Sequence, residues 1–298
     1  KNMVMTAILL CSVGLVVNVI AMTGVGNTFS LMINNWAGDS LMIAFILIAL
    51  ASLILGMGLP VTASYIVLGT LSAPALYNLI VDGQIIQTIM DGTFPEQAKA
   101  LFMLVKPEAM EMLSAPMAES AARELMAMMP MELKSSIRDS VLPGPRLTYA
   151  LLSAHMIIFW LSQDSNVTPP VCLCGFTAAA IAKTPPMATG LASWKIAKGL
   201  YIIPLLFAYT AILSGSLMVK MEIFTFALVG LFALACGLQG FMVSGLSLIT
   251  RALLMVAGIA MLWPDMIWIH LAGLGLFAAI WTGHKASLKK NSPSVETV

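Results

Sequence analysis

Two short stretches rich in glycine, proline and hydroxyl or amide residues interrupt the apolar segments of this chain. The first reads GMGLPVTASY at residues 56–65, and the second reads SQDSNVTPP at residues 162–170. Lipid cannot form hydrogen bonds with exposed backbone, so non-helical chain at membrane depth must face protein or a water-filled cavity. A pair of interrupted hydrophobic segments is the sequence feature that best indicates the binding site of a secondary transporter.

The composition indicates a polytopic protein embedded in the lipid bilayer. The chain has 298 residues, of which 59% are hydrophobic and 10% charged, and its mean hydropathy is +0.94. Soluble domains carry about 25% charged residues. The formal net charge of +1, without a cluster of Lys and Arg, predicts no nucleic-acid partner. The chain lacks a Walker-type phosphate loop and an HExxH motif, which argues against ATP-driven transport and zinc proteolysis.

Hydrophobic segments divide the chain into six expected parts. A spanning helix needs about 20 apolar residues. We expect a first spanning helix with an interfacial segment (1–40), a re-entrant hairpin (41–80), an extramembrane helical insert (81–147), a broken transmembrane helix with a basic cytoplasmic loop (148–198), four C-terminal membrane helices (199–283) and a cytoplasmic tail (284–298). The expected fold class is therefore an all-α polytopic membrane protein.

The hairpin is predicted from the lengths of its two arms. The stretches 41–55 and 61–76 are each too short to span the bilayer comfortably, and a tight turn separates them. The alternative is one kinked span of about 35 residues, which the membrane thickness disfavours. Placing the lysines of 183–198 in the cytoplasm puts the insert outside and both Lys1 and the tail inside. A full crossing at the first interruption would instead put Lys1 outside.

The insert combines an acidic excess with prolines that each precede a short stretch of good helix formers. Proline suits the first turn of a helix, so several short helices are expected here. Six methionines of the insert offer an adaptable docking face or, in the interpretation that we favour, pack these helices together or onto the bilayer. They are Met110, Met112, Met126, Met128, Met129 and Met131.

The interruptions supply the oxygen atoms and N–H groups that an ion and a carboxylate require. Carbonyl and side-chain oxygens suit sodium, whereas N–H groups at helix ends suit a carboxylate. The expected sodium contacts are Gly56, Thr62, Asp164, Asn166 and Thr168; the expected solute contacts are Gly58, Pro60, Thr62, Ser64, Thr168 and Pro169. Asp164 is either a functional intramembrane acid or a solvated residue at the outer interface. The glycines permit close approach of a ligand or simple helix packing.

Enzymatic chemistry and structural metal binding both lack a convincing residue pattern. His155 with Ser153 or Ser162 is a weak nucleophile–base candidate, and a histidine that bonds between helices is the simpler interpretation. We therefore expect no enzyme and no organic cofactor. Four cysteines lie in apolar runs and are interpreted as packing residues: Cys11, Cys172, Cys174 and Cys236.

At these same residues the chain resembles the large membrane subunit of the tripartite ATP-independent periplasmic (TRAP) transporters, specifically the TAXI type. The matching motifs are LGMGLPVTASYIVL at 55–68, APAL at 73–76, HM at 155–156, NVTPPV at 166–171 and TGL at 189–191. The resemblance is strong over about residues 40–80 and 150–210. Many relatives have Asp at the position of Asn166, which leaves Asp164 as the candidate to compensate.

The resemblance implies a sodium symporter with an elevator mechanism in a bacterial or archaeal inner membrane. A periplasmic substrate-binding protein would deliver an organic anion, such as a dicarboxylate, to this permease. Residues 56–65 resemble the tip of a second hairpin, and counterparts of the first repeat are absent, so the chain resembles a C-terminal half. The implied further partners are the N-terminal transporter repeat and a small membrane subunit or its fused equivalent. The alternative is a non-transporting membrane scaffold or an incomplete fragment.

Overall fold

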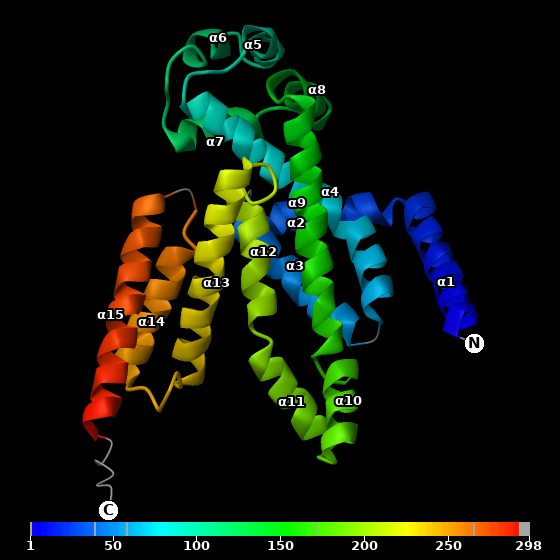
Figure 1. Ribbon diagram of the computed structural model, residues 1–298. Helices are drawn as coiled ribbons and strands as arrows, with labels where there is room; N and C mark the ends of the chain where they lie inside the picture. The colour runs from blue at the N-terminus through cyan, green and yellow to red at the C-terminus, as the bar shows by residue number, and fades with distance from the viewer. Residues whose placement is uncertain (1, 39, 58, 171, 265, 292–298) are drawn as a thin grey trace, which may run out of the picture. The chain divides into compact units, whose positions relative to one another are not determined.

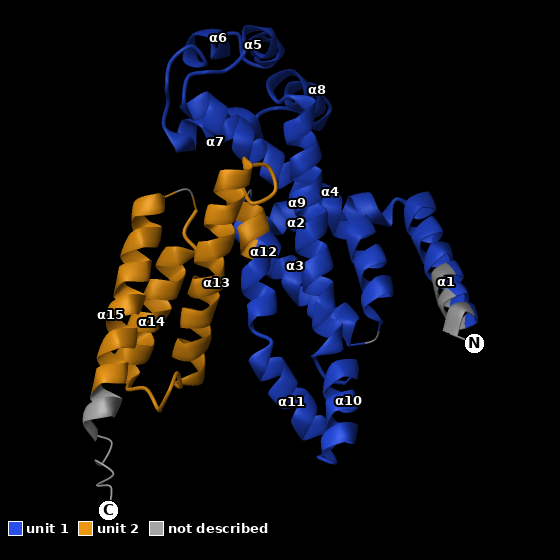
Figure 2. Ribbon diagram, viewed as in Figure 1, with its two compact units in different colours: residues 1–204 blue, residues 205–298 orange. Residues whose placement is uncertain are grey.

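The structure is a computed structural model that describes residues 2–38, 40–57, 59–170, 172–264 and 266–291 (Figure 1). These residues form helices and irregular connections, with one isolated β-bridge between Phe241 and Gly245 in the described part. The predicted all-α class is therefore confirmed. The chain divides into two compact units, residues 1–204 and residues 205–298 (Figure 2), and each is described by itself.

The first unit contains most of the helices. They are α1 (Asn2–Thr23), α2 (Val25–Ala37), α3 (Leu41–Gly56), α4 (Val61–Met90), α5 (Glu96–Met103), α6 (Ala109–Met112), α7 (Glu119–Ala127), α8 (Met131–Val141), α9 (Gly144–Ser162), the 3-10 helix η1 (Gln163–Asn166), α10 (Leu173–Ala182) and α11 (Pro186–Ile196). Helix α12 (Gly199–Tyr209) crosses into the second unit, which continues with α13 (Leu217–Gln239), α14 (Leu248–Met261) and α15 (Ile267–Asn291).

Four stretches of the described chain are long and apolar enough to cross a membrane, by length and composition. They are Val61–Met90, Pro186–Tyr209, Leu217–Gln239 and Ile267–Ala286. A fifth arises if α1 and α2, bent by 73° at Gly24, count as one span. Gly24 has a φ of 69°, a left-handed conformation that glycine adopts without a steric cost. The buried face of α2 packs on α4, where the Ser30 hydroxyl donates to the Leu71 carbonyl over 2.8 Å.

Helices α3 and α4 lie side by side, so the chain reverses direction at residues 57–60 (Figure 1). Our expectation that the second arm ends near Leu76 is wrong, because α4 continues to Met90 and is long enough to span. Pro74 lies inside this helix and removes one backbone hydrogen bond. Ala75 and Leu76 beside it are completely buried, so tertiary packing holds the helix together through the proline. Whether the hairpin is re-entrant stays a prediction.

The insert forms four short helices, α5 to α8, as expected from its prolines. Pro95 and Pro130 stand directly before α5 and α8. Arg138 of α8 donates to both carboxylate oxygens of Asp82 on α4, over 2.8 and 2.9 Å. Because this pair joins the insert to a long helix, it fixes the insert on the rest of the first unit.

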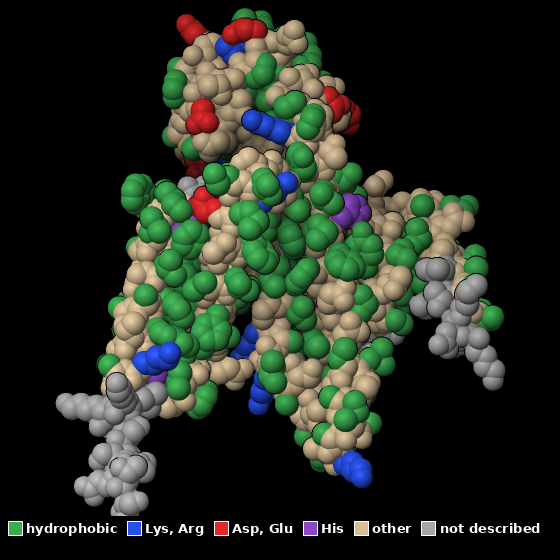
Figure 3. Space-filling model, in the orientation of Figure 1, with side chains coloured by type: hydrophobic (Ala, Val, Ile, Leu, Met, Phe, Trp, Pro, Cys, Tyr) green, Lys and Arg blue, Asp and Glu red, His purple; other side chains and the backbone are tan. Residues whose placement is uncertain are grey.

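The methionines of the insert fall into a buried group and an exposed group. Met126 and Met129 are buried among the short helices, as the packing interpretation predicts. Met110, Met112, Met128 and Met131 are exposed, together with Leu104, which leaves an apolar surface on the insert. Figure 3 shows acidic side chains beside hydrophobic ones over the same helices.

The basic stretch 183–198, expected as a loop, instead contains helix α11. With α12 it forms the apolar stretch Pro186–Tyr209. Lys195 lies in the last turn of α11, where a positive charge is favourable because the helix dipole is negative there. The three lysines suggested a loop; Lys195 lies within α11, whereas Lys183 and Lys198 lie in the turns before and after it. The four helices expected in the C-terminal part also differ in length, since α12 and α14 have only 11 and 14 residues.

The second unit is held together by close helix packing at glycines. Helix α14 packs on both α13 and α15. A Cβ atom at Gly258 would lie 2.8 Å from the Gly230 carbonyl oxygen, and one at Gly273 would lie 2.8 Å from the Ala257 carbonyl oxygen. Small residues allow such approach in membrane helices. Cys236 packs in this core, whereas Cys11 and Cys174 are exposed, so the packing interpretation fails for those two cysteines.

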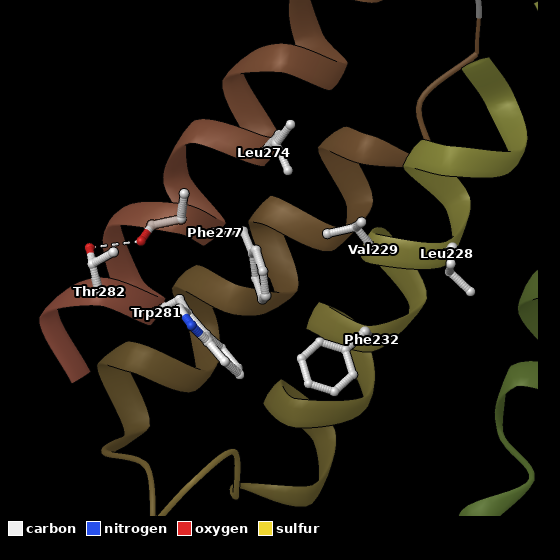
Figure 4. A pocket seen from close by; sticks show the side chains of 8 residues that line it. Leu228, Val229, Phe232, Leu274, Phe277, Trp281 and Thr282 are labelled. Atoms are coloured by element: carbon white, nitrogen blue, oxygen red, sulfur yellow. Dashed lines mark hydrogen bonds between the residues drawn. The ribbon is translucent and has the colours of Figure 1, made fainter. Parts of the chain in front are cut away.

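An apolar cavity of about 560 Å³ opens between α13 and α15 (Figure 4). The rings of Phe232, Phe277 and Trp281 contribute to its wall, and the Thr282 hydroxyl donates to the Ala278 carbonyl. The cavity offers almost no polar surface, and none of the residues expected to bind solute line it. It is therefore not a candidate for an anion site.

We expect the Gly258→Ala variant to unfold at a lower temperature than the unchanged chain. The added methyl group meets a backbone carbonyl that cannot move without separating α13 from α14, and overpacking costs about 1–3 kcal/mol. Gly275→Ala is the matched control on α15, where no described atom lies within 4 Å of the new Cβ. The control should gain stability, since alanine favours helix. Equal melting of the two variants would contradict the close contact.

Candidate functional site

The two interruptions predicted from the sequence meet in the first unit. The 3-10 helix η1 packs against α3 and α4, the two helices that flank the first interruption. A Cβ atom at Gly56 would lie 3.1 Å from Cβ and 3.3 Å from Cα of Ser165. Gly56 is therefore needed so that the end of α3 can approach the second interruption closely.

The second interruption is a true break in the helix. Helix α9 ends at Ser162, η1 follows for one turn, and α10 begins at Leu173. The amide groups of Val167 and Thr168 both donate to the Asp164 carbonyl, over 3.0 and 2.9 Å. These bonds close a compact turn in place of regular helix. The expected discontinuous helix is thus present, although its position in a membrane stays a prediction.

Asp164 is the central acidic group of this break. The residue is only 1% exposed, so the interpretation as a solvated surface acid is wrong. Its Oδ1 atom accepts hydrogen bonds from the Thr168 hydroxyl over 2.6 Å and from the Tyr201 hydroxyl over 2.5 Å. Its Oδ2 atom is buried without a hydrogen-bond partner among the described residues. A buried carboxylate with an unpaired oxygen is costly unless a cation or a proton joins it.

Two serine hydroxyls share this lack of a partner. Ser52 of α3 and Ser64 of α4 are buried, and their Oγ atoms accept and donate no hydrogen bond within the described chain. Both helices pack against η1 and against α9. The two helices that pack against η1 therefore each contain a buried hydroxyl oxygen without a hydrogen-bond partner in the described chain.

The predicted site residues differ in burial. Gly56, Ser64, Asp164 and Thr168 are buried; Asn166 and Pro169 are half-buried; Pro60 and Thr62 are exposed; Gly58 lies outside the described residues. The Asn166 amide donates to the Gln163 side-chain oxygen over 3.4 Å. That Asp164 compensates for the uncharged Asn166 stays a prediction.

Tyr201 and Trp194 join the cluster and were missed from the sequence. Tyr201 lies on α12, 37 residues after Asp164. The Trp194 indole donates to its hydroxyl oxygen over 3.4 Å, which connects α11 as well. The sequence did contain one signal for Tyr201: its hydroxyl lies in an apolar segment, and a buried hydroxyl needs a hydrogen-bond partner. Nothing local in the sequence indicates which partner.

His155 connects two helices, as the simpler interpretation proposed. Its Nδ1 atom lies 3.3 Å from the Tyr65 hydroxyl, so the residue joins α9 to α4. The Ser162 hydroxyl donates to the Ile158 carbonyl over 2.8 Å. It is therefore engaged within its own helix, and no described bond links it to His155.

The chain is similar to one known protein family. A family model described as "Tripartite ATP-independent periplasmic transporter, DctM component" matches residues 1–219. Searches against curated proteins and against solved structures find no match. The matched part covers more than half of the 298 residues and contains both interruptions and the insert. The chain therefore belongs to the DctM-component family of the tripartite ATP-independent periplasmic transporters.

Proposed function

We propose that this chain is the permease of a sodium-coupled transporter that imports an organic carboxylate or dicarboxylate delivered by a periplasmic binding protein. Membership of the family supports a membrane permease component. The observation that carries the coupling proposal is the Oδ2 atom of Asp164, which is buried and unpaired within the described residues. A coupling cation would supply the missing partner.

The donor set favours a hard monovalent cation. Carboxylate and hydroxyl oxygens suit hard cations, whereas transition metals prefer nitrogen and sulfur. The described residues contain no group of three or more His, Cys, Asp or Glu that could hold a metal ion. A monovalent cation at Asp164 leaves the buried site neutral. A proton would also neutralise Asp164, but the new O–H group would itself need an acceptor.

The choice of an organic anion rests on the helix end beyond the break. The first N–H groups of a helix lack intrahelical partners and carry the positive end of its dipole, so they favour a carboxylate. Helix α10 begins at Leu173, directly after the break. We propose that this end and the residues Gly58, Pro60, Thr62, Ser64, Thr168 and Pro169 contact the solute.

We also propose that the chain works with three protein partners in a bacterial or archaeal inner membrane, as a TAXI-type elevator. These are the periplasmic binding protein, the N-terminal repeat and a small membrane subunit or its fused equivalent. The exposed methionines Met110, Met112, Met128 and Met131 support docking of the binding protein on the insert, because flexible apolar side chains adapt to a partner.

The test is uptake of labelled carboxylates and dicarboxylates into proteoliposomes. The vesicles would contain this chain and the small subunit, with or without the N-terminal repeat, and the binding protein would be supplied outside. An inward sodium gradient, an equal potassium gradient and a proton gradient would be compared. Uptake driven by sodium alone is the expected result. Uptake driven equally by the proton gradient would contradict sodium coupling, and absence of uptake in every arm would favour a scaffold.

A further inference from the structure

The second unit contains a buried histidine whose two ring nitrogens both face acceptor atoms. His270, in the first turns of α15, is 4% exposed. Its Nε2 atom lies 2.6 Å from the Trp263 carbonyl oxygen, and its Nδ1 atom lies 3.2 Å from Glu222 Oε1. Glu222 belongs to α13, and Trp263 follows the end of α14. One imidazole ring therefore connects α13, the end of α14 and α15.

Counting protons shows that a neutral histidine and an ionised glutamate do not fit this arrangement. A neutral imidazole carries one N–H group and one lone pair. If the N–H is on Nδ1, the Nε2 lone pair faces the Trp263 oxygen at 2.6 Å. If it is on Nε2, the Nδ1 lone pair faces the Glu222 carboxylate at 3.2 Å. One additional proton removes the conflict in either case.

We propose that Glu222 and His270 form a proton-binding site that fastens α15 to α13 and to the end of α14. In the proton-bound form, Nε2–H donates to the Trp263 carbonyl and Nδ1–H donates to the Glu222 carboxylate. The side chain of Glu222 is 34% exposed, whereas that of His270 is 4% exposed. Both residues lie beyond residue 219, where the family match ends. The proposed sodium site, in contrast, lies within the matched residues.

An aromatic ring and a helix end lie next to His270. The Phe226 ring, one turn after Glu222, has its centroid 4.9 Å from that of the imidazole. An aromatic face attracts a cation at this distance. The Trp263 carbonyl lies at the C-terminal end of α14, the negative end of that helix dipole. The glutamate, the ring and the end of α14 therefore offset the burial of a positive charge, whereas the first turn of α15, which contains His270, opposes it.

The other charged side chains of these helices do not oppose the proton. Lys220 lies two residues before Glu222 and so points to a different side of α13. Arg251 donates to the Gly237 and Leu238 carbonyls, near the opposite end of that helix. The remaining described titratable groups on α13 to α15 are Cys236, His284 and Lys285, and each lies far from Glu222 and His270 along its helix. Asp265 lies outside the described residues.

The first experiment follows the unfolding temperature of the full chain in lipid nanodiscs between about pH 5 and pH 8, the range in which histidine titrates. The proton-bound pair stabilises the folded state at low pH, and this contribution is lost as the pH rises through deprotonation. We expect a fall of about 2–4 °C, the size of one lost hydrogen bond in a large domain.

The Glu222→Gln variant tests whether the contact between residue 222 and His270 requires a bound proton. Its amide can donate to Nδ1 of a neutral His270, while Nε2–H still donates to the Trp263 carbonyl. The bridge is kept without an additional proton, so the pH-dependent fall should disappear. His284→Gln is the matched control, because His284 bonds to Ser244 and should leave the fall unchanged. If the unfolding temperature of Glu222→Gln falls with rising pH as much as that of the unchanged chain, the proposal is overturned.

A second measurement keeps the proposal testable if that variant folds poorly. ¹⁵N-histidine NMR of the unchanged chain, with the His270 signal assigned from its loss in His270→Gln, reports the protons on each ring nitrogen. We expect two protonated nitrogens at low pH and one after the transition. One protonated nitrogen throughout the range would overturn the proposal, even if the unfolding temperature varied with pH for another reason.

Discussion

The Asp164→Ala variant is expected to lose almost all sodium-driven uptake. The substitution removes the buried carboxylate that we propose neutralises the coupling ion, and the remaining hydroxyl groups carry no charge to replace it. A decrease in apparent sodium affinity on the order of 100-fold corresponds to roughly 2.8 kcal/mol. The measurement is the initial rate of uptake into proteoliposomes as a function of external sodium.

Three further variants locate that effect at the carboxylate. Asp164→Asn keeps the side-chain volume but removes the charge, so it should behave like alanine. Tyr201→Phe keeps the carboxylate and removes one of the two hydrogen bonds to Oδ1, so we expect a smaller loss, on the order of tenfold. Asp91→Asn changes an exposed carboxylate bonded to Gln87 and should leave uptake unchanged. Wild-type sodium dependence in Asp164→Ala would exclude Asp164 as an ion ligand.

The largest expected loss of stability is that of Arg138→Ala. Arg138 is 8% exposed and binds both oxygens of Asp82, whose side chain is 20% exposed. Removing the guanidinium leaves a largely buried carboxylate without its partner, which costs about 3–5 kcal/mol. The insert should then detach from α4 more readily. Thermal unfolding and limited proteolysis of the insert would measure the change.

A surface ion pair provides the matched control for this prediction. Arg123 and Glu119 pair on α7 with side chains 45% and 56% exposed, so Arg123→Ala should cost less than about 1 kcal/mol. The double variant Asp82→Ala/Arg138→Ala leaves no unpaired charge and should recover part of the lost stability. If Arg123→Ala and Arg138→Ala unfold alike, the buried pair is not what holds the insert.

Local sequence patterns predicted much of the helical architecture. Apolar runs located the long helices, and Pro95 and Pro130 marked the starts of α5 and α8 because proline fits the first turn of a helix. The end of the second hairpin arm was predicted wrongly near Leu76, because α4 continues to Met90 with Pro74 inside it. Burial of the neighbouring residues outweighs one missing backbone bond there, and a local pattern contains no measure of burial.

The lysines within the apolar stretch after α10 were also ambiguous, because they fit either a loop or a helix. Lys183, Lys195 and Lys198 suggested a loop, whereas α11 occupies most of that stretch. Lysine is a good helix former, so its presence does not distinguish an exposed helix from a loop. The deciding factor is how this stretch packs and continues into α12, which depends on residues outside it.

The sequence by itself determined the class of the protein, the positions of both interruptions and the acidic residue at the second one. Each of these depends on composition or on neighbouring residues, because glycine, proline and apolar runs act locally on the backbone. Only the tertiary structure decided that Asp164 is buried and that Tyr201 donates to it from 37 residues away. It alone brought Gly56 against Ser165. Burial and hydrogen bonds between distant residues follow from helix packing, which has no periodic signature in the chain.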